Sequence, residues 1–200
     1  VYSSLGGTHL TQEDISVMRS VPNMRILSPC DPNELEDCVN FCIKNKGGPI
    51  YLRIGKAGER TLINQDSEKW QFNKIRKLRN GNKICILSYG PISKIAIKLS
   101  DNFKNKISVF SCHTLKPFDN SGLKKIMKKY PIIITLEDHS IIGGLSSIVK
   151  QGAYINKYSG KLLNFALKDK FIHNYGNHAD LLEAHGISYK FIKRNILKLI

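Results

Sequence analysis

The sequence predicts an α/β fold of two consecutive three-layer units with mostly parallel sheets, the first of them incomplete at its N-terminus. Short apolar runs typical of buried strands alternate with segments whose apolar residues recur at the helical period. This alternation is lost once, at residues 55–82. Repeated β-α units of this length indicate parallel strands with right-handed crossovers. We therefore assign residues 1–60 to the first unit, 61–80 to a linker and 81–200 to the second unit.

The first unit opens on a glycine-rich loop that leads into a helix. Thr11, with Asp14 three residues later, is a helix-start signature, and Ile15, Met18 and Val21 then recur on one face. His9 would lie just before the helix N-terminus, where the helix dipole favours a neutral imidazole. The preceding glycine pair would let a ligand approach the backbone. His9 is therefore a candidate acid, base or hydrogen-bond donor, and packing of the loop is its alternative role.

Two strands and a well-marked helix complete the first unit. After a strand at 25–28, a helix over 31–46 begins with Asp31 as N-cap and Pro32 at its first position. The strand at 49–54 alternates, which places Tyr51 and Arg53 on the same face. Arg53 ends this strand, where ligands of open α/β sheets collect, and a guanidinium there suits phosphate or carboxylate. A salt bridge at a domain interface is the alternative.

The second unit repeats the strand–helix pattern to the end of the chain. Its strands are strongly apolar, and each helix has an apolar face. We predict strands at 83–88, 107–110, 132–136 and 162–165, and helices around 92–103, 123–127, 145–149, 179–184 and 188–199.

One polar cluster follows a strand of the second unit. Glu137, Asp138 and His139 come after the strand at 132–136, and Gly143-Gly144 precede the next helix, whose free N–H groups could receive an anion. The segment has neither GxGxxG nor GxxxxGK[ST], so it does not indicate a nucleotide-binding loop. A tight turn with interface contacts is the favoured interpretation.

The net charge of +15 comes from the later part of the chain. Residues 1–66 carry 7 Lys and Arg against 8 Asp and Glu, and residues 67–200 carry 24 against 8. Of the 31 basic residues, 24 are Lys, spread along the predicted helices without interleaved aromatic residues. We therefore predict a solvated basic face and no nucleic-acid partner.

The five cysteines form no CxxC motif or zinc spacing, which predicts free buried thiols and a cytoplasmic protein. No signal peptide is recognised, and no apolar run approaches the ~18 residues of a membrane span. His113, His173, His178 and His185 lack ligand spacing and are predicted to be structural, so no metal site is expected.

Several motifs resemble those of the transketolase family and follow the family's order along nearly the whole chain. The resemblance is greatest to the C-terminal subunit of split, two-chain transketolases. The motifs are GGTHLTQEDI (6–15), MR (18–19), PNM (22–24), GPIYLR (48–53), TLKPFD (114–119), LEDH (136–139), GGLSS (143–147) and LLEAHGI (181–187).

The resemblance implies an enzyme that uses thiamine diphosphate and Mg²⁺ to move a two-carbon ketol unit between sugar phosphates. Residues 1–60 would be the last part of a pyrimidine-binding domain and 81–200 the family's C-terminal domain. A diphosphate-binding domain or subunit would be a partner, in a homodimer or heterotetramer. The chain alone would be inactive and would bind no cofactor.

By motif, the resemblance implies that His9 hydrogen-bonds the substrate and that Arg53 holds its phosphate. A glutamate and an aromatic residue that contact the cofactor in the family would precede Val1. Leu5 stands where sugar-phosphate transketolases often have Asp. A 1-deoxyxylulose-5-phosphate synthase and a 2-oxo-acid dehydrogenase beta subunit are alternatives, as is a non-catalytic dimerisation or interaction module.

Overall fold

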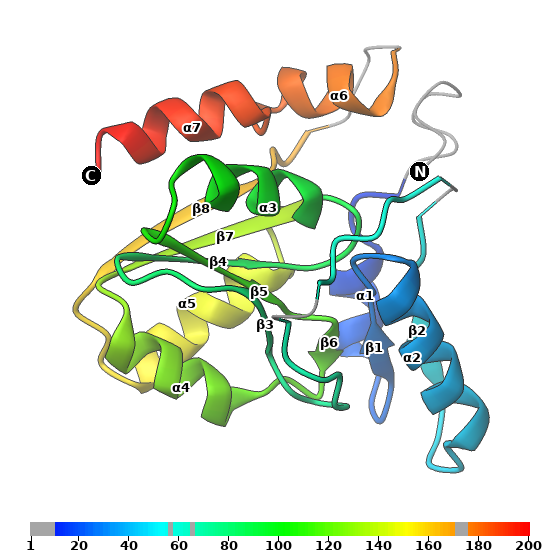
Figure 1. Cartoon of the computed structure of the whole chain (residues 1–200). Coiled ribbons are helices and arrows are strands. Elements are labelled where there is room, and N and C mark those ends of the chain that lie inside the picture. Colours follow the sequence, from blue (N-terminus) through cyan, green and yellow to red (C-terminus); the bar gives the residue numbers. More distant parts are fainter. Residues whose placement is uncertain (1–10, 56–57, 65–66, 171–175) are drawn as a thin grey trace.

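The computed structural model describes residues 11–55, 58–64, 67–170 and 176–200, and these form two sheets with seven helices (Figure 1). The predicted α/β class is confirmed. The helices are α1 (Asp14–Ser20), α2 (Pro32–Lys44), α3 (Ser93–Asn102), α4 (Asn120–Lys129), α5 (Leu145–Ile155), α6 (His178–Ala184) and α7 (Tyr189–Leu197). The strands are β1 (Arg25–Leu27), β2 (Ile50–Leu52), β3 (Arg76–Arg79), β4 (Ile84–Ser88), β5 (Ile107–Ser111), β6 (Thr114–Lys116), β7 (Ile132–Ser140) and β8 (Lys161–Leu167).

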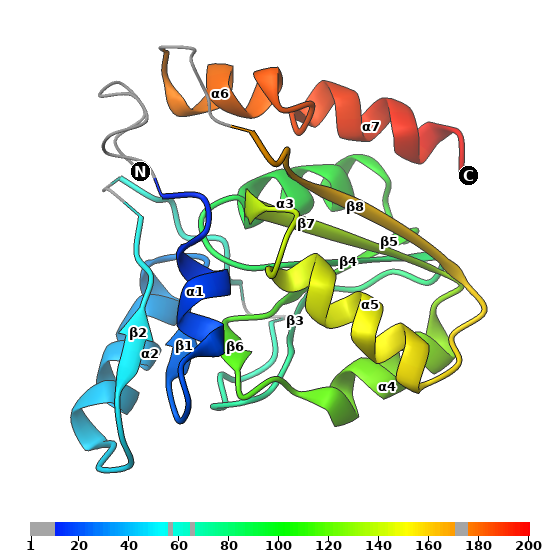
Figure 2. The same ribbon diagram turned by 180° about the vertical axis from the view of Figure 1, so that it is seen from behind.

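The larger sheet has the strand order β3-β5-β4-β7-β8. Strands β5, β4, β7 and β8 are parallel, and the edge strand β3 is antiparallel to β5. Helices α3, α6 and α7 cover one face of this sheet, and α4 and α5 cover the other (Figures 1 and 2). The second unit therefore has the three layers and the mostly parallel sheet that the sequence predicts.

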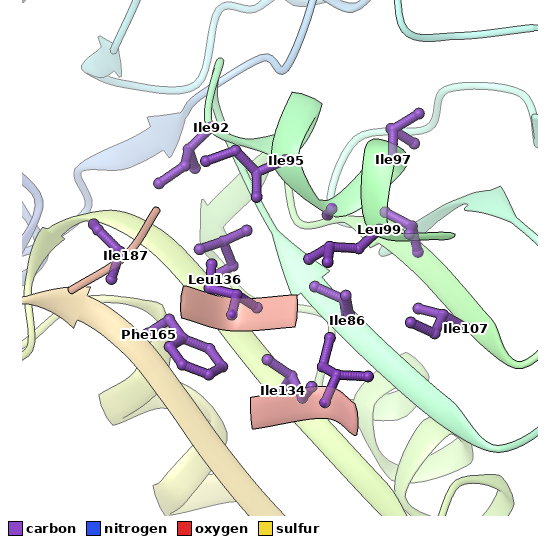
Figure 3. Packing of buried hydrophobic residues seen from close by; sticks show 14 of the residues in the cluster. Ile86, Ile92, Ile95, Ile97, Leu99, Ile107, Ile134, Leu136, Phe165 and Ile187 are labelled. Atoms are coloured by element: carbon purple, nitrogen blue, oxygen red, sulfur yellow. The ribbon is translucent and has the colours of Figure 1, made fainter. Parts of the chain in front are cut away.

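The core of the second unit consists of two clusters, because successive side chains of each strand point to opposite faces of the sheet. On β4, Ile84 and Ile86 belong to one buried cluster, together with residues of α3 and α7. Figure 3 shows this cluster, in which Ile86 lies next to Leu99 of α3 and Ile134 lies next to Phe165 of β8. Cys85 and Leu87 point the other way, into the cluster formed with α4 and α5. Every residue of β4 is buried, as in a strand covered on both faces, and all but its last residue, Ser88, are apolar.

The smaller sheet has the order β2-β1-β6 and joins the two units. Strands β1 and β2 are parallel, as predicted. Strand β6 comes from the second half of the chain and is antiparallel to β1 (Figure 2). The sequence analysis missed β6, because three residues carry too little periodicity to predict a strand.

Strand β3 lies within residues 61–80, where only a linker was expected. It pairs with β5, and its burial alternates, with Arg76 and Leu78 buried. A guanidinium inside a strand masks the apolar alternation in the sequence. Its burial is possible because Arg76 Nε donates to the Glu68 carbonyl at 2.6 Å and Nη1 lies 3.5 Å from Glu34 Oε1.

The start of α1 also differs from the prediction. The helix begins at Asp14, its N-cap is Glu13, and no side chain caps it. The predicted cap, Thr11, is exposed. Tertiary contacts hold the segment instead, since Ser140 N–H donates to the Gln12 carbonyl at 2.7 Å.

The start of α2 agrees with the prediction. The Asp31 carboxylate accepts the Glu34 N–H at 2.9 Å, and Pro32 occupies the first turn. Its predicted apolar face is only partly buried. Cys38 is buried, whereas Val39 is 39% exposed.

Candidate functional site

Arg53 lies at the contact between the two units, directly after β2. Its Nε donates to Asp14 Oδ2 at 2.8 Å, and Nη2 donates to the main-chain carbonyl of Asp138 at 2.9 Å. The Arg53 side chain is only 13% exposed. Arg53 therefore forms its salt bridge within the first unit, with Asp14, and contacts the second unit through a hydrogen bond to a main-chain carbonyl.

Asp14 receives a second donor from the same strand face. Tyr51 Oη donates to Asp14 Oδ2 at 2.9 Å, so Tyr51 and Arg53 share a face, as their alternation predicted. Burial and the hydrogen bond to Asp14 raise the pKa of Tyr51 to about 12. Burial would lower the pKa of Arg53, but its surroundings, Asp14 and Asp138 among them, raise it. Both donors remain protonated at neutral pH.

Asp138 continues this row of charges into the second unit. Burial would raise the pKa of Asp138, but the hydrogen bond and charge of His178, together with Arg53, lower it. The ionised carboxylate accepts a hydrogen bond from His178 Nε2, 2.7 Å from Asp138 Oδ2. His178 was predicted to be merely structural, and the sequence analysis did not connect it with Asp138.

Glu137 occupies the anion-binding position that the sequence indicated at the start of α5. Its carboxylate accepts the N–H groups of Leu145 and Ser146 at 2.7 and 2.8 Å, and Tyr89 Oη lies 3.2 Å away. A side chain at Gly144 would collide with Glu137. The free N–H groups at the N-terminus of α5 are thus bound by a carboxylate of the same chain. Glu137 also lies inside β7, which runs to Ser140, and not beyond the strand as expected.

His139 ties the same end of β7 to α1. Its Nδ1 lies 2.8 Å from the Ser140 carbonyl, which can only accept, so Nδ1 carries the proton. Nε2 then accepts the Ser16 N–H at 3.3 Å. Arg19 donates to the Gly143 carbonyl close by. The polar cluster that the sequence singled out is therefore a tight turn with interface contacts, the favoured interpretation.

This cluster lies in the crevice where an open α/β sheet ordinarily binds a ligand. In the larger sheet the strand order reverses between β4 and β7, and ligands bind beyond the carboxyl ends of such strands. Here Tyr89 follows β4 and Glu137 lies in the last part of β7, while Arg53 and Asp14 approach from the first unit. The first unit itself thus packs where a cofactor would otherwise bind.

The remaining candidate residues are placed as follows. His9 and His173 lie outside the described residues. His113 is buried beside Trp70, and His185 Nδ1 accepts the Lys168 N–H at 2.9 Å. All five cysteines have free thiols, as predicted. Within the described ranges no group of three or more His, Cys, Asp and Glu side chains could hold a metal ion.

None of the helices in the described part of the chain is long and apolar enough to cross a membrane.

Two domain models of one family match the chain in succession. The model of the transketolase pyrimidine-binding domain matches residues 2–59, and that of the transketolase C-terminal domain matches residues 73–192.

Curated relatives cover the same region. The chain is 32% identical to 1-deoxy-D-xylulose-5-phosphate synthase of Thermotoga petrophila over 98% of its own length and 32% of the relative. It is 31% identical to the synthase of Vibrio parahaemolyticus over 98% of its length and 31% of the relative. The chain thus spans about a third of the length of these relatives.

Solved structures share the fold. A structure described as a split-gene transketolase, inactive β4 tetramer, has a TM-score of 0.82 at 24% identity, over 96% of this chain and 62% of that one. The Campylobacter jejuni transketolase has a TM-score of 0.65 at 16% identity, over 98% of this chain and 29% of that one. With both domain models matched in order, the chain belongs to the transketolase family as a C-terminal section.

Proposed function

We propose that this chain is the C-terminal section of a thiamine-diphosphate-dependent transferase that moves a two-carbon ketol unit between sugar phosphates. The observation that carries the proposal is the succession of the two family domains along the chain. In this proposal residues 1–60 belong to the pyrimidine-binding domain, 61–80 connect the units, and 81–200 form the C-terminal domain.

The cofactor would be bound mainly by another domain or subunit. Thiamine diphosphate supplies a carbon nucleophile that carries the two-carbon unit, and Mg²⁺ neutralises its diphosphate. The described residues do not fit the diphosphate, because Glu137 already occupies the N-terminus of α5. We therefore propose a diphosphate-binding partner, within a homodimer or heterotetramer. The description of the split-gene relative as an inactive β4 tetramer supports this need for a partner.

Two residues of this chain would face the substrate. His9 would hydrogen-bond the substrate, and Arg53 would contribute to binding its phosphate. The burial of Arg53 and its hydrogen bond to the Asp138 main-chain carbonyl support an additional role in joining the units.

A 1-deoxy-D-xylulose-5-phosphate synthase is the second candidate, because relatives 30–32% identical over nearly the whole chain carry that name. Such an enzyme would release carbon dioxide from pyruvate, whereas ketol transfer would not. Both reactions place a two-carbon unit on a phosphorylated aldehyde, so the two candidates share an acceptor class.

The test uses the complete enzyme, as the full-length chain or with its diphosphate-binding subunit. With thiamine diphosphate and Mg²⁺, we expect ketol transfer from a ketose phosphate to an aldose phosphate. Carbon dioxide release from labelled pyruvate would select the second candidate. Omission of thiamine diphosphate is the control, and the 200-residue chain alone should give no turnover. Absence of both reactions would overturn the proposal.

A further inference from the structure

A row of four side chains, two aspartates, an arginine and a histidine, crosses the contact between the two units. Asp14 and Arg53 belong to the first unit, and Asp138 and His178 to the second. The Arg53–Asp14 and His178–Asp138 pairs are 2.8 and 2.7 Å long, and the Arg53 Nη2 donor reaches the main-chain carbonyl of Asp138. One guanidinium thus contacts both aspartates, pairing with the carboxylate of Asp14 and with the main-chain carbonyl of Asp138.

We propose that His178 and Asp138 are positioning residues for the site of the proposed transferase. His178 binds the Asp138 carboxylate and thereby leaves the Arg53 guanidinium to Asp14. The pairing of Arg53 with Asp14 then holds the first turn of α1, which follows the His9 segment in the sequence. This inference rests on the proposed function.

Competition between the two carboxylates is the physical basis. The side chains of Asp14, Arg53 and Asp138 are 8, 13 and 14% exposed, so little water is available to solvate a carboxylate that loses its partner. A buried carboxylate without a donor is costly, and a guanidinium can offer two parallel donors. Arg53 already donates to the main-chain carbonyl of Asp138, so without His178 its guanidinium is a donor within this residue's surroundings. Diverting Arg53 would leave Asp14 with Tyr51 alone.

The first turn of α1 depends on this pairing because it has no cap of its own. The helix begins at Asp14 without a capping side chain. Its other anchors are the Ser16 N–H bond to His139 and the Gln12 carbonyl that accepts from Ser140. Two of these contacts, from Ser16 and Gln12, are made with His139 and Ser140 at the end of β7. The third, Arg53 with Asp14, depends on Arg53, which is itself bonded to Asp138 of β7. A shift of Arg53 would therefore move the start of α1 relative to the second unit.

Three variants of the complete enzyme test the proposal. We expect His178→Ala to lower kcat by about tenfold, because small misplacements of a reacting geometry are costly, with a change in the KM of the acceptor of less than about threefold. His178→Gln retains a donor at a position similar to Nε2 and should restore kcat to within about twofold. Ser188→Ala removes the N-cap bond of α7 and should lower Tm while leaving kcat unchanged.

Hydrogen exchange gives a readout that is independent of activity. In the 200-residue chain, His178→Ala should speed exchange of the Ser16 amide by about tenfold, which His178→Gln and Ser188→Ala should not do. Unchanged Ser16 exchange in His178→Ala, or a loss of kcat that Gln does not rescue, would overturn the proposal. If the wild-type enzyme shows neither reaction, the proposed function fails, and the exchange data still decide whether His178 positions α1.

Discussion

At the scale of single residues, His113 shows how burial sets the charge of a side chain. The residue is fully buried, its Nδ1 lies 2.9 Å from Thr114 Oγ1, and its ring stacks on Trp70 with centroids 5.1 Å apart. Burial, reinforced by the positive charge of Arg76, lowers the pKa of His113 to about 3. The folded protein therefore keeps this imidazole neutral at physiological pH.

This lowered pKa makes folding stability depend on pH. Between the unperturbed pKa of about 6.5 and about 3, the unfolded chain binds a proton at His113 that the folded chain does not, so acidification favours unfolding. We expect His113→Phe, which retains the stack on Trp70, to reduce the loss of unfolding free energy between about pH 7.5 and about pH 5 by about 2 kcal/mol. Urea unfolding at both pH values measures this loss. Equal losses in variant and wild type would contradict the prediction.

The two roles of Arg53 can be separated in the complete enzyme. We expect Arg53→Ala to raise the KM of a phosphorylated acceptor by about tenfold or more, since a charge-assisted contact to phosphate is lost. Asp14→Asn is the matched control, because it removes the ion pair that holds Arg53 within the first unit and keeps the guanidinium. It should lower Tm without changing this KM. An unchanged KM in Arg53→Ala would leave Arg53 with the interface role alone.

At the scale of elements, two aspartates join helix starts to the segment between the units. Asp31 Oδ1 caps α2, and Oδ2 accepts the N–H groups of Leu62 and Ile63 at 2.8 and 2.9 Å. Asp119 caps α4 through the Gly122 N–H and accepts the Ile75 N–H at 3.2 Å. Residues 55–82 lack helical periodicity, and helix caps hold parts of this segment in place.

Removing the Asp31 carboxylate should therefore cost more than a lost helix cap. We expect Asp31→Ala to lower the free energy of unfolding by about 3 kcal/mol, as one cap bond and two further acceptors disappear. Asp31→Asn keeps one carbonyl oxygen and should lose about half as much. Ser188→Ala, which removes one cap bond, should lose about 1 kcal/mol. Chemical denaturation measures the free energy of unfolding of the three variants. Equal losses for Asp31→Ala and Ser188→Ala would be inconsistent with a carboxylate that both caps α2 and binds the segment at 62–63.

At the scale of the whole molecule, the two units share structure. Strand β6 completes the smaller sheet from the second half of the chain, and Arg53 reaches β7 from the first. Trp70 packs between them, with ring centroids 5.9 Å from Phe41 of α2 and 5.1 Å from His113. Without the second unit the smaller sheet would lose β6, and without the first unit β7 would lose its hydrogen bond from Arg53.

This shared structure predicts a single unfolding transition. Trp70 fluorescence reports on the contact between the units, and far-UV circular dichroism reports on helices of both. We expect the two signals to have the same denaturant midpoint, within about 0.2 M, as for a two-state protein. A fluorescence midpoint well below that of the dichroism would show that the units separate before they unfold.

Local signals in the sequence were sufficient for much of this fold. Asp31 and Pro32 start α2 as predicted, and the alternation of 49–54 places Tyr51 and Arg53 on one face. The short strands β3 and β6 were missed. Their pairing joins distant residues, such as Ile26 with Lys116; β3 is largely basic, and β6 is only three residues long.

The sequence by itself determined the α/β class, the order of the helices and of the four parallel strands in the second unit, and the family of the chain. Only the tertiary structure decided the partners of the charged residues. Arg53 meets Asp138 across 85 residues and Asp138 meets His178 across 40, while Glu137 turns to the N-terminus of α5. The reason is physical: periodicity records which face of an element is apolar, whereas the partner of a buried charge depends on which donors folding brings within about 3 Å.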